Sequence, residues 1–159
     1  MANSTLTTPD SRPLRIALIG AGRHAQHHAR AILRCPGVQL VAVADPSDAA
    51  QAAMRDIVPG IGCFKTPEEL FASERLNVVH IITPPASHAP LARMAIKAGC
   101  HIYVEKPFTE SVEDAQQILD EASAKGLRVC AGHQLLYEPP TRVLTQYLPS
   151  IGRVVHVES

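Results

Sequence analysis

A glycine-rich turn is the first pattern in the sequence that points to chemistry. It follows the apolar run LRIALI, and its residues are Gly20, Ala21, Gly22, Arg23, His24 and Ala25. In a turn of this kind the first glycine permits a sharp bend from strand to helix, and the second lets the backbone approach a pyrophosphate. The small residue at the end keeps the helix close to the sheet, while free N–H groups at the helix start receive the anion. The turn therefore predicts a dinucleotide site.

An acidic residue closes the next apolar run, VQLVAVAD, at Asp45, which lies 25 positions after Gly20. Dinucleotide-binding turns are followed about 20 residues later by an acid that accepts hydrogen bonds from the adenosine ribose. A carboxylate there repels a 2′-phosphate, and no basic residue follows Asp45 closely, so NAD is favoured over NADP. Arg23 still offers a positive charge nearby. The alternative is a plain structural turn in which Asp45 caps the next helix.

Three more segments place polar residues where buried strands are expected to end: TPPASH at 83–88, EKP at 105–107 and GHQ at 132–134. Ligands of open α/β sheets bind beyond the carboxyl ends of the strands. A lysine beside a nicotinamide can exchange the proton that accompanies hydride transfer, and Lys106 is the candidate. Partial burial and the positive ring of the cofactor would favour its neutral form. The spacing alone equally allows a surface ion pair between Glu105 and Lys106.

The eight histidines and four cysteines give weaker signals. His24 and His28 would share one face of a helix, but no acidic residue lies near them in the sequence. We therefore expect a solvated helix face there and no metal site. No CxxC pair occurs, which excludes zinc-ribbon and thioredoxin-like sites. Free, reduced thiols are expected, as in a cytoplasmic protein.

The elements that must position these residues alternate along the chain. Short apolar runs predict strands at residues 14–20, 38–45, 62–64, 77–84, 101–107 and 127–132, with helical patterns between them. Thr66, Pro67 and Glu69 form a strong helix start, Gly126 ends a helix over 111–125, and a last helix is expected at about 140–148. Six strands with intervening helices predict an α/β fold with a doubly wound parallel sheet.

Composition excludes several classes of protein. The chain has 159 residues, 15 basic and 15 acidic side chains, and a pI near 7.1. No basic surplus is present to meet nucleic acid or an anionic membrane, so neither partner is expected. No apolar run reaches the roughly 18 residues of a membrane-spanning helix, and the polar first residues carry no secretory signal.

The sequence resembles the N-terminal half of the Gfo/Idh/MocA family of nicotinamide-dependent oxidoreductases, from about Leu14 to its end. The resemblance is carried by IALIGAGRHA, VAVADPS, VVHIITPPASHAPLARMAIKAGCHIYVEKPFTESVEDA and CAGHQLLYEP. The TPPxxH and EKP segments at that spacing are far more specific than the glycine turn. A flavodoxin-like or response-regulator-like protein fits less well, because neither needs the glycine turn or EKP.

The resemblance implies roles for individual residues. Gly20, Gly22 and Ala25 match the dinucleotide turn, and Asp45 matches the ribose-binding acid. The loop that lines the ribose and nicotinamide side matches Thr83, Pro84, Pro85 and His88. Glu105 and Lys106 match the EKP signature, whose lysine is associated with catalysis. Gln134 falls where the family often has an amide near the substrate. Leu136 stands where a common form of the family has an arginine, which puts a substrate contact there in doubt.

Family members carry a second α/β domain that supplies much of the substrate pocket, a catalytic histidine and often the subunit interface. From this we expect a flexible leader at residues 1–13, a Rossmann domain at 14–150, and the first strand of a missing substrate domain at 151–159. Full-length relatives would be homo-oligomers through that domain. His156 is not taken as the missing histidine.

The resemblance implies an NAD-dependent dehydrogenase acting on a sugar, cyclitol or sugar-acid-like alcohol. The alternative is a dinucleotide-binding module, or an inactive fragment, without turnover.

Overall fold

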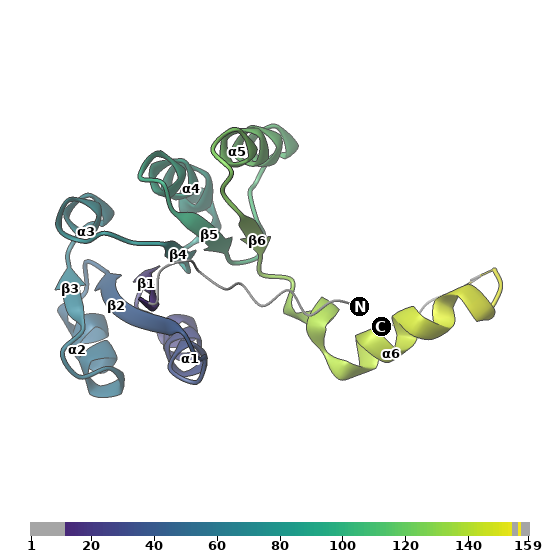
Figure 1. Ribbon diagram of the computed structural model, residues 1–159, viewed down its shortest axis with the longest axis horizontal. Helices are drawn as coiled ribbons and strands as arrows, with labels where there is room; N and C mark the ends of the chain where they lie inside the picture. Colours follow the sequence, from purple (N-terminus) through teal and green to yellow (C-terminus); the bar gives the residue numbers. More distant parts are fainter. Residues whose placement is uncertain (1–11, 154–155, 157–159) are drawn as a thin grey trace.

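The computed structural model describes residues 12–153 and 156, and its centre is one parallel sheet of six strands (Figure 1). The strand order is β3-β2-β1-β4-β5-β6, and every neighbouring pair is parallel. The strands are β1 Leu14–Ile19, β2 Val38–Ala44, β3 Gly62–Phe64, β4 Val78–Ile81, β5 His101–Val104 and β6 Val129–Ala131. This is the doubly wound α/β fold predicted from the alternation of apolar runs and helical patterns, and that prediction is confirmed.

Helices cover the sheet in two layers, with α1 and α2 on one face and α3, α4 and α5 on the other (Figure 1). Their bounds are α1 Arg23–Ile32, α2 Asp48–Ile57, α3 Pro67–Ser73, α4 His88–Lys97 and α5 Val112–Ala124. Each layer has its own apolar core. Leu18, Val43 and Met54 are fully buried beneath α1 and α2, while Ile81 and Ile118 are fully buried on the other side.

Side-chain caps fix where three of these helices begin. Ser47 accepts a hydrogen bond from the backbone N–H of Ala50 at the start of α2, and Ser111 does the same for Asp114 at the start of α5. Thr66 caps α3, with Pro67 in its first turn as the sequence predicts. Because all six strands are parallel, their carboxyl ends lie along one edge of the sheet, and the predicted site residues lie there too.

The last helix, α6 Pro139–Tyr147, lies clear of both helix layers (Figure 1). Large apolar side chains before, in and after it are more than one third exposed, namely Leu135, Leu136, Tyr137, Val143, Leu144, Tyr147, Leu148 and Ile151. A helix was expected at about 140–148, so it begins and ends one residue earlier than predicted.

Two predictions fall partly outside the described residues. Residues 1–11 of the expected leader are not described, nor are 154, 155 and 157–159 of the expected last strand. Residues 152, 153 and 156 are described and are not in a strand. In the described part of the chain no helix has the length and apolar character needed to cross a membrane. All four cysteines are free.

Candidate functional site

The glycine turn lies where the carboxyl ends of β1, β2 and β4 meet. Gly20 has φ +97°, and a Cβ there would lie 2.5 Å from the backbone oxygen of Ile82. Its N–H donates to the Ala44 oxygen at 2.8 Å. An L-residue rarely adopts such a φ, so the fold itself requires glycine at this position. Ala25 is fully buried against the sheet, as its place in the turn predicts.

Gly22 is free of such constraints, which indicates a different reason for its presence. It is the N-cap of α1 with φ −64°, it offers no side-chain cap, and a Cβ there would have nothing within 4 Å. Arg23 and His24 follow it with exposed side chains. The missing Cβ therefore leaves an open approach to the first N–H groups of a helix, which favour an anion.

Asp45 ties the turn to the end of β2. One carboxylate oxygen accepts a hydrogen bond from the Ala21 N–H at 2.7 Å, and the other accepts one from the Ser47 N–H at 2.8 Å. The alternative in which Asp45 caps the next helix is wrong, because Ser47 is the cap of α2. A carboxylate has about four acceptor positions, so two remain available for hydroxyl donors.

A cavity of about 460 Å³ opens beside Asp45 and is lined by the turn and by the loop after β4. Thr83, Pro84 and Ser87 contribute that second wall, where the Ser87 hydroxyl is 2.7 Å from the Thr83 hydroxyl. Pro85 begins the short 3₁₀ helix Pro85–Ser87 that shapes the loop.

Lys65 also lines this cavity, and the sequence did not reveal it. Its Nζ donates to the Pro46 oxygen at 3.1 Å and pairs with the Asp48 carboxylate at 2.6 Å. Lys65 directly follows β3, which pairs with the carboxyl half of β2. The sequence offers one signal for it, since ends of neighbouring parallel strands lie together. A basic group therefore stands near Asp45 after all, from the next strand end.

His88 lies beneath the loop rather than in the cavity and is fully buried. Its Nε2 is 2.8 Å from the Thr83 oxygen and its Nδ1 is 2.8 Å from the Pro107 oxygen. Both partners are carbonyl oxygens, so each can only accept a hydrogen bond from the ring. The contact with a cofactor implied by the family resemblance stays a prediction, and in this structure the ring is buried between two loop carbonyls. His88 joins the loop after β4 to the loop after β5.

Glu105 directly follows β5 and is buried, 7% exposed, and its carboxylate contacts two histidines of α1. Its Oε1 lies 3.1 Å from His28 Nε2 and 3.3 Å from His24 Nε2, and its Oε2 accepts the Lys106 N–H at 3.2 Å. The alternative that the spacing allowed, a surface ion pair between Glu105 and the Lys106 side chain, is not found among the described residues. No acidic residue lies near His24 and His28 in the sequence, but the fold brings one to them. Glu105, 77 residues after His28, contacts both rings, so the expectation of a solvated helix face is wrong.

His80 and Tyr103 complete this cluster from the adjacent strands β4 and β5. The two rings stack with centroids 4.9 Å apart, and His28 packs edge-on against both. His28 Nδ1 lies 3.1 Å from His80 Nδ1, and the Tyr103 hydroxyl donates to Glu105 at 3.3 Å. Pairing of His80 with Tyr103 follows from the parallel register, which a strand alignment of VVHI with HIYV would have indicated.

The protonation states in the cluster follow from burial and from Glu105. Burial lowers the pKa of His80 to about 4, with a smaller contribution from His28. Burial also lowers the pKa of His28, although the Glu105 carboxylate opposes the shift. For Glu105, burial alone would raise the pKa, but the Lys106 N–H bond and the charges of His24 and His28 together hold it below its usual value. At neutral pH the rings of His28 and His80 are therefore neutral, and Glu105 is ionised.

We expect the folded chain to lose stability in acid because of His80. Between pH 6.5 and 4 the unfolded chain binds a proton at this residue and the folded chain does not. The stabilising contribution is therefore complete above pH 6.5 and lost as the pH falls towards 4, by about 3 kcal/mol at most. Urea unfolding at several pH values, with EDTA present, measures the loss.

Two variants make this test specific. His80→Phe keeps an aromatic ring on Tyr103 and should give a shallower fall of the free energy of unfolding with acid. His133→Ala, at an exposed position, should keep the slope of the parent chain. Equal slopes in all three proteins would contradict the assignment.

Lys106 and Gln134 line one broad cavity of about 810 Å³ at the ends of β5 and β6. The structure thus brings together the two residues predicted to face the substrate. Lys106 is exposed, so within the described residues its amine lacks the partial burial that would favour its neutral form. Gln134 begins the 3₁₀ helix Gln134–Tyr137 and also borders the cavity around Glu105.

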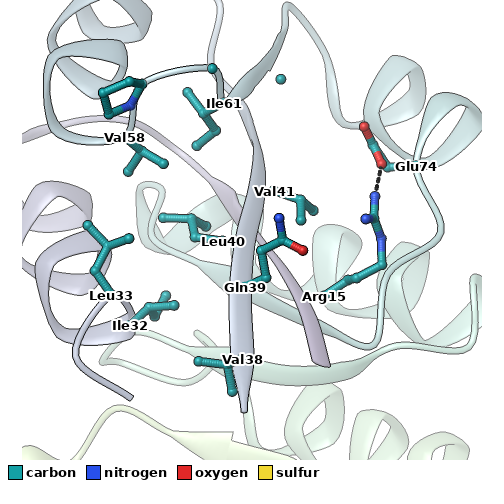
Figure 2. A pocket seen from close by; sticks show the side chains of 13 residues that line it. Arg15, Ile32, Leu33, Val38, Gln39, Leu40, Val41, Val58, Ile61 and Glu74 are labelled. Atoms are coloured by element: carbon teal, nitrogen blue, oxygen red, sulfur yellow. Dashed lines mark hydrogen bonds and ion pairs between the residues drawn. The ribbon is translucent and has the colours of Figure 1, made fainter. Parts of the chain in front are cut away.

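A further cavity of about 540 Å³ lies beside the amino half of β2 and contains none of the predicted site residues (Figure 2). β3 pairs only with residues 42–44 of β2, so among the described residues the stretch before Ala42 has no strand on that side. Figure 2 shows Val58 and Ile61 on one side and the Arg15–Glu74 ion pair on the other. This cavity follows from a short edge strand.

Residues 14–133 match the family model described as "Oxidoreductase family, NAD-binding Rossmann fold", the GFO_IDH_MocA family. The chain belongs to this family. The matched segment contains the glycine turn, Asp45, the loop after β4 and the EKP segment. The resemblance predicted from the sequence is confirmed.

Relatives in the Gfo/Idh/MocA family include sugar and cyclitol dehydrogenases. The chain is 36% identical to inositol 2-dehydrogenase of Agrobacterium fabrum, over 73% of this chain and 35% of that protein. It is 32% identical to D-glucoside 3-dehydrogenase of Escherichia coli, over 73% and 33%. Among solved structures, GenD2 from gentamicin A biosynthesis, in complex with NAD, aligns with TM-score 0.79 and 27% identity over 89% of this chain and 40% of that one. The chain spans about a third to two fifths of the length of these relatives.

The residues present fit the NAD of the family. Space at Gly22 leads to an uncapped helix start, which suits a pyrophosphate. The remaining acceptor positions of Asp45 suit the ribose hydroxyls, beside a cavity large enough for part of an adenosine. When bound, NAD supplies the acceptor for a hydride.

Proposed function

We propose that this chain is the NAD-binding part of a dehydrogenase that oxidises a hydroxyl group of a sugar or cyclitol. The observation that supports the proposal best is the shared cavity of Lys106 and Gln134, at the same carboxyl edge of the sheet as the dinucleotide turn. A cavity there combines a proton-exchanging amine with an amide that can bind a hydroxyl. The relatives that are inositol and glucoside dehydrogenases support the substrate class.

Each residue has a stated task in this proposal. Gly22 and the start of α1 hold the pyrophosphate, and Asp45 holds the adenosine ribose. The Thr83 loop bounds the nucleotide, and His88 fixes that loop against the EKP segment. Lys106 accepts the hydroxyl proton of the substrate as its carbon is oxidised and returns it in the reverse direction. Further substrate contacts come from outside the described residues.

The exposure of Lys106 favours a second candidate, a dinucleotide-binding module without turnover. Catalysis needs a substrate held close to the reacting groups and water excluded, and an open cavity provides neither. The two functions share cofactor binding and differ in hydride transfer. A cytoplasmic location remains a proposal, supported by the four free thiols.

The experiment is to measure NADH binding to residues 1–159 and then NAD reduction by the protein as it occurs naturally. The alcohols are a panel of inositols, glucosides and sugar acids. We expect binding by the short chain and substrate-dependent NADH formation by the natural protein. Binding without turnover of any alcohol would support the module instead. Absence of NADH binding would contradict both.

Asp45 is expected to make the chain prefer NADH over NADPH. Asp45→Ser removes a charged acceptor and the repulsion of a 2′-phosphate, so NADH affinity should fall about tenfold or more while NADPH affinity rises. Fluorescence titration of both reduced cofactors measures the ratio. In the Asp45→Ser chain, Lys65→Met should reverse the gain for NADPH, because Lys65 is the cation on the same cavity.

Asp56→Asn is the matched control, since it removes an exposed carboxylate near the end of α2 that does not line this cavity. It should leave NADH affinity unchanged. Equal or tighter NADPH binding by the parent chain would refute the preference.

A further inference from the structure

A groove beside α1 gathers imidazoles around one buried carboxylate. The cavity has a volume of about 400 Å³, and its walls come from α1, β4, β5 and the residue that begins Gln134–Tyr137. His24 and His28 lie one turn apart on α1, and Glu105 ends β5 opposite them. In the part of the chain that the structure describes, this is the one group of three residues whose ligand atoms could all reach a metal ion.

We propose that His24, His28 and Glu105 form a binding site for one divalent transition-metal ion, with Zn²⁺ the ion that best matches the donors. Two imidazole nitrogens and one carboxylate oxygen are a common donor set for zinc sites that keep an open position. The proposal is independent of the dehydrogenase function proposed above.

The distances between the donor atoms suit tetrahedral coordination. Ligands bound at about 2.0–2.1 Å in a tetrahedron stand about 3.3–3.4 Å apart. Glu105 Oε1 lies 3.3 Å from His24 Nε2 and 3.1 Å from His28 Nε2, and all three atoms lie within 4.8 Å of one another. The His24 side chain is about half exposed, and a small rotation of its ring would bring all three donor atoms to bonding distance of one ion.

Neighbouring groups already hold two of the three ligands, His28 and Glu105, in an orientation that suits metal binding. With a metal on Nε2, the ring of His28 carries its hydrogen on Nδ1, which points at His80 Nδ1 at 3.1 Å. His80 accepts there as a neutral imidazole. Glu105 is fixed by the Tyr103 hydroxyl on one oxygen and by the Lys106 N–H on the other. Such outer partners commonly fix ring orientation in metal sites.

The site therefore has a buried half and an exposed half. His28 and Glu105 are mostly buried and in contact, while His24 approaches from the solvent side. The groove leaves the fourth position to water or to another small ligand. An ion here would join the glycine turn of α1 to the end of β5 without any new protein contact.

The test uses residues 1–159 without a histidine tag, freed of metal with EDTA and then exchanged into chelator-free buffer. Zn²⁺ is titrated by calorimetry, and Co²⁺ serves as a coloured probe whose visible absorption is much stronger in four-coordinate sites. We expect one ion per chain. His24→Ala should weaken Zn²⁺ binding by more than tenfold, and its exposed position keeps the fold intact. His27→Ala is the matched control, an exposed imidazole on the same helix outside the group, and should change nothing.

Two more variants separate this site from chance binding. His80→Leu removes the partner of His28 and should cost about 10–100-fold in affinity, the usual effect of an outer partner. His80→Asn, which retains an acceptor, should restore much of it. Binding that persists unchanged in His24→Ala, or that is lost equally in His27→Ala or Cys35→Ser, would overturn the proposal. So would a Co²⁺ spectrum of the six-coordinate type.

Discussion

Lys106→Ala is expected to lower kcat of the natural protein by about 10²–10⁴-fold, the usual contribution of a general acid or base. The amine is the proposed proton-exchanging group in the cavity shared with Gln134, and its exposed side chain has no hydrogen bond or ion pair within residues 12–153. NADH affinity should therefore change by less than about fivefold, the worth of an exposed charge contact.

Lys106→Arg provides the control. It keeps a positive charge at the edge of the sheet but holds its proton at any working pH, so it should be nearly as slow as Lys106→Ala. Steady-state rates give kcat, and titration of the 159-residue chain gives NADH affinity. A slow variant with much weaker NADH binding would assign Lys106 to holding the cofactor, and a normal kcat in both variants would remove it from the chemistry.

Replacing the two glycines of the turn by alanine is expected to affect different properties, NADH affinity at Gly22 and the free energy of unfolding at Gly20. Gly22→Ala should weaken NADH binding by about 10–100-fold, because a Cβ would block the approach of a pyrophosphate to the start of α1. Its effect on the free energy of unfolding should stay under about 1 kcal/mol, since nothing lies within 4 Å of the new carbon. Gly20→Ala should destabilise the chain by at least about 2 kcal/mol, because the backbone has φ +97° and the Ile82 oxygen is 2.5 Å away.

Urea unfolding and NADH titration of both variants measure the two effects together. Gly37→Ala is a useful comparison, since Gly37 also has a positive φ but has open space around it. It should show the conformational cost without the clash. A stable Gly20→Ala, or a Gly22→Ala that binds NADH normally, would contradict the roles assigned from the geometry.

The fold followed from local patterns in the sequence. Apolar runs ended at Gly20 and Asp45, helices began at Ser47, Thr66 and Ser111, and alternation of strand and helix required a parallel sheet. Each of these features depends on residues close together in the chain. The ends of three strands were less well predicted, because the apolar runs continue into the loops: β4 spans Val78–Ile81 where 77–84 was expected, β5 spans His101–Val104 where 101–107 was expected, and β6 spans Val129–Ala131 where 127–132 was expected.

The partners of the site residues could not be read in the same way. Glu105 is held by histidines about 80 residues before it, and Lys65 reaches Pro46 from the end of the next strand. These contacts depend on which strands are neighbours and on which face a side chain points to. The exposure of a side chain also depends on distant packing, as the buried Glu105 beside the exposed Lys106 shows. His88 was expected to face a ligand because it belongs to the TPPxxH segment, yet its side chain is fully buried.

His88 determines how the two sides of the candidate active centre can move. One rigid aromatic ring spans from the Thr83 carbonyl to the Pro107 carbonyl, next to the lysine. A displacement of either loop would therefore have to move the ring with it or break one of these two contacts. The imidazole acts as a spacer between the nucleotide wall and the segment that carries the amine.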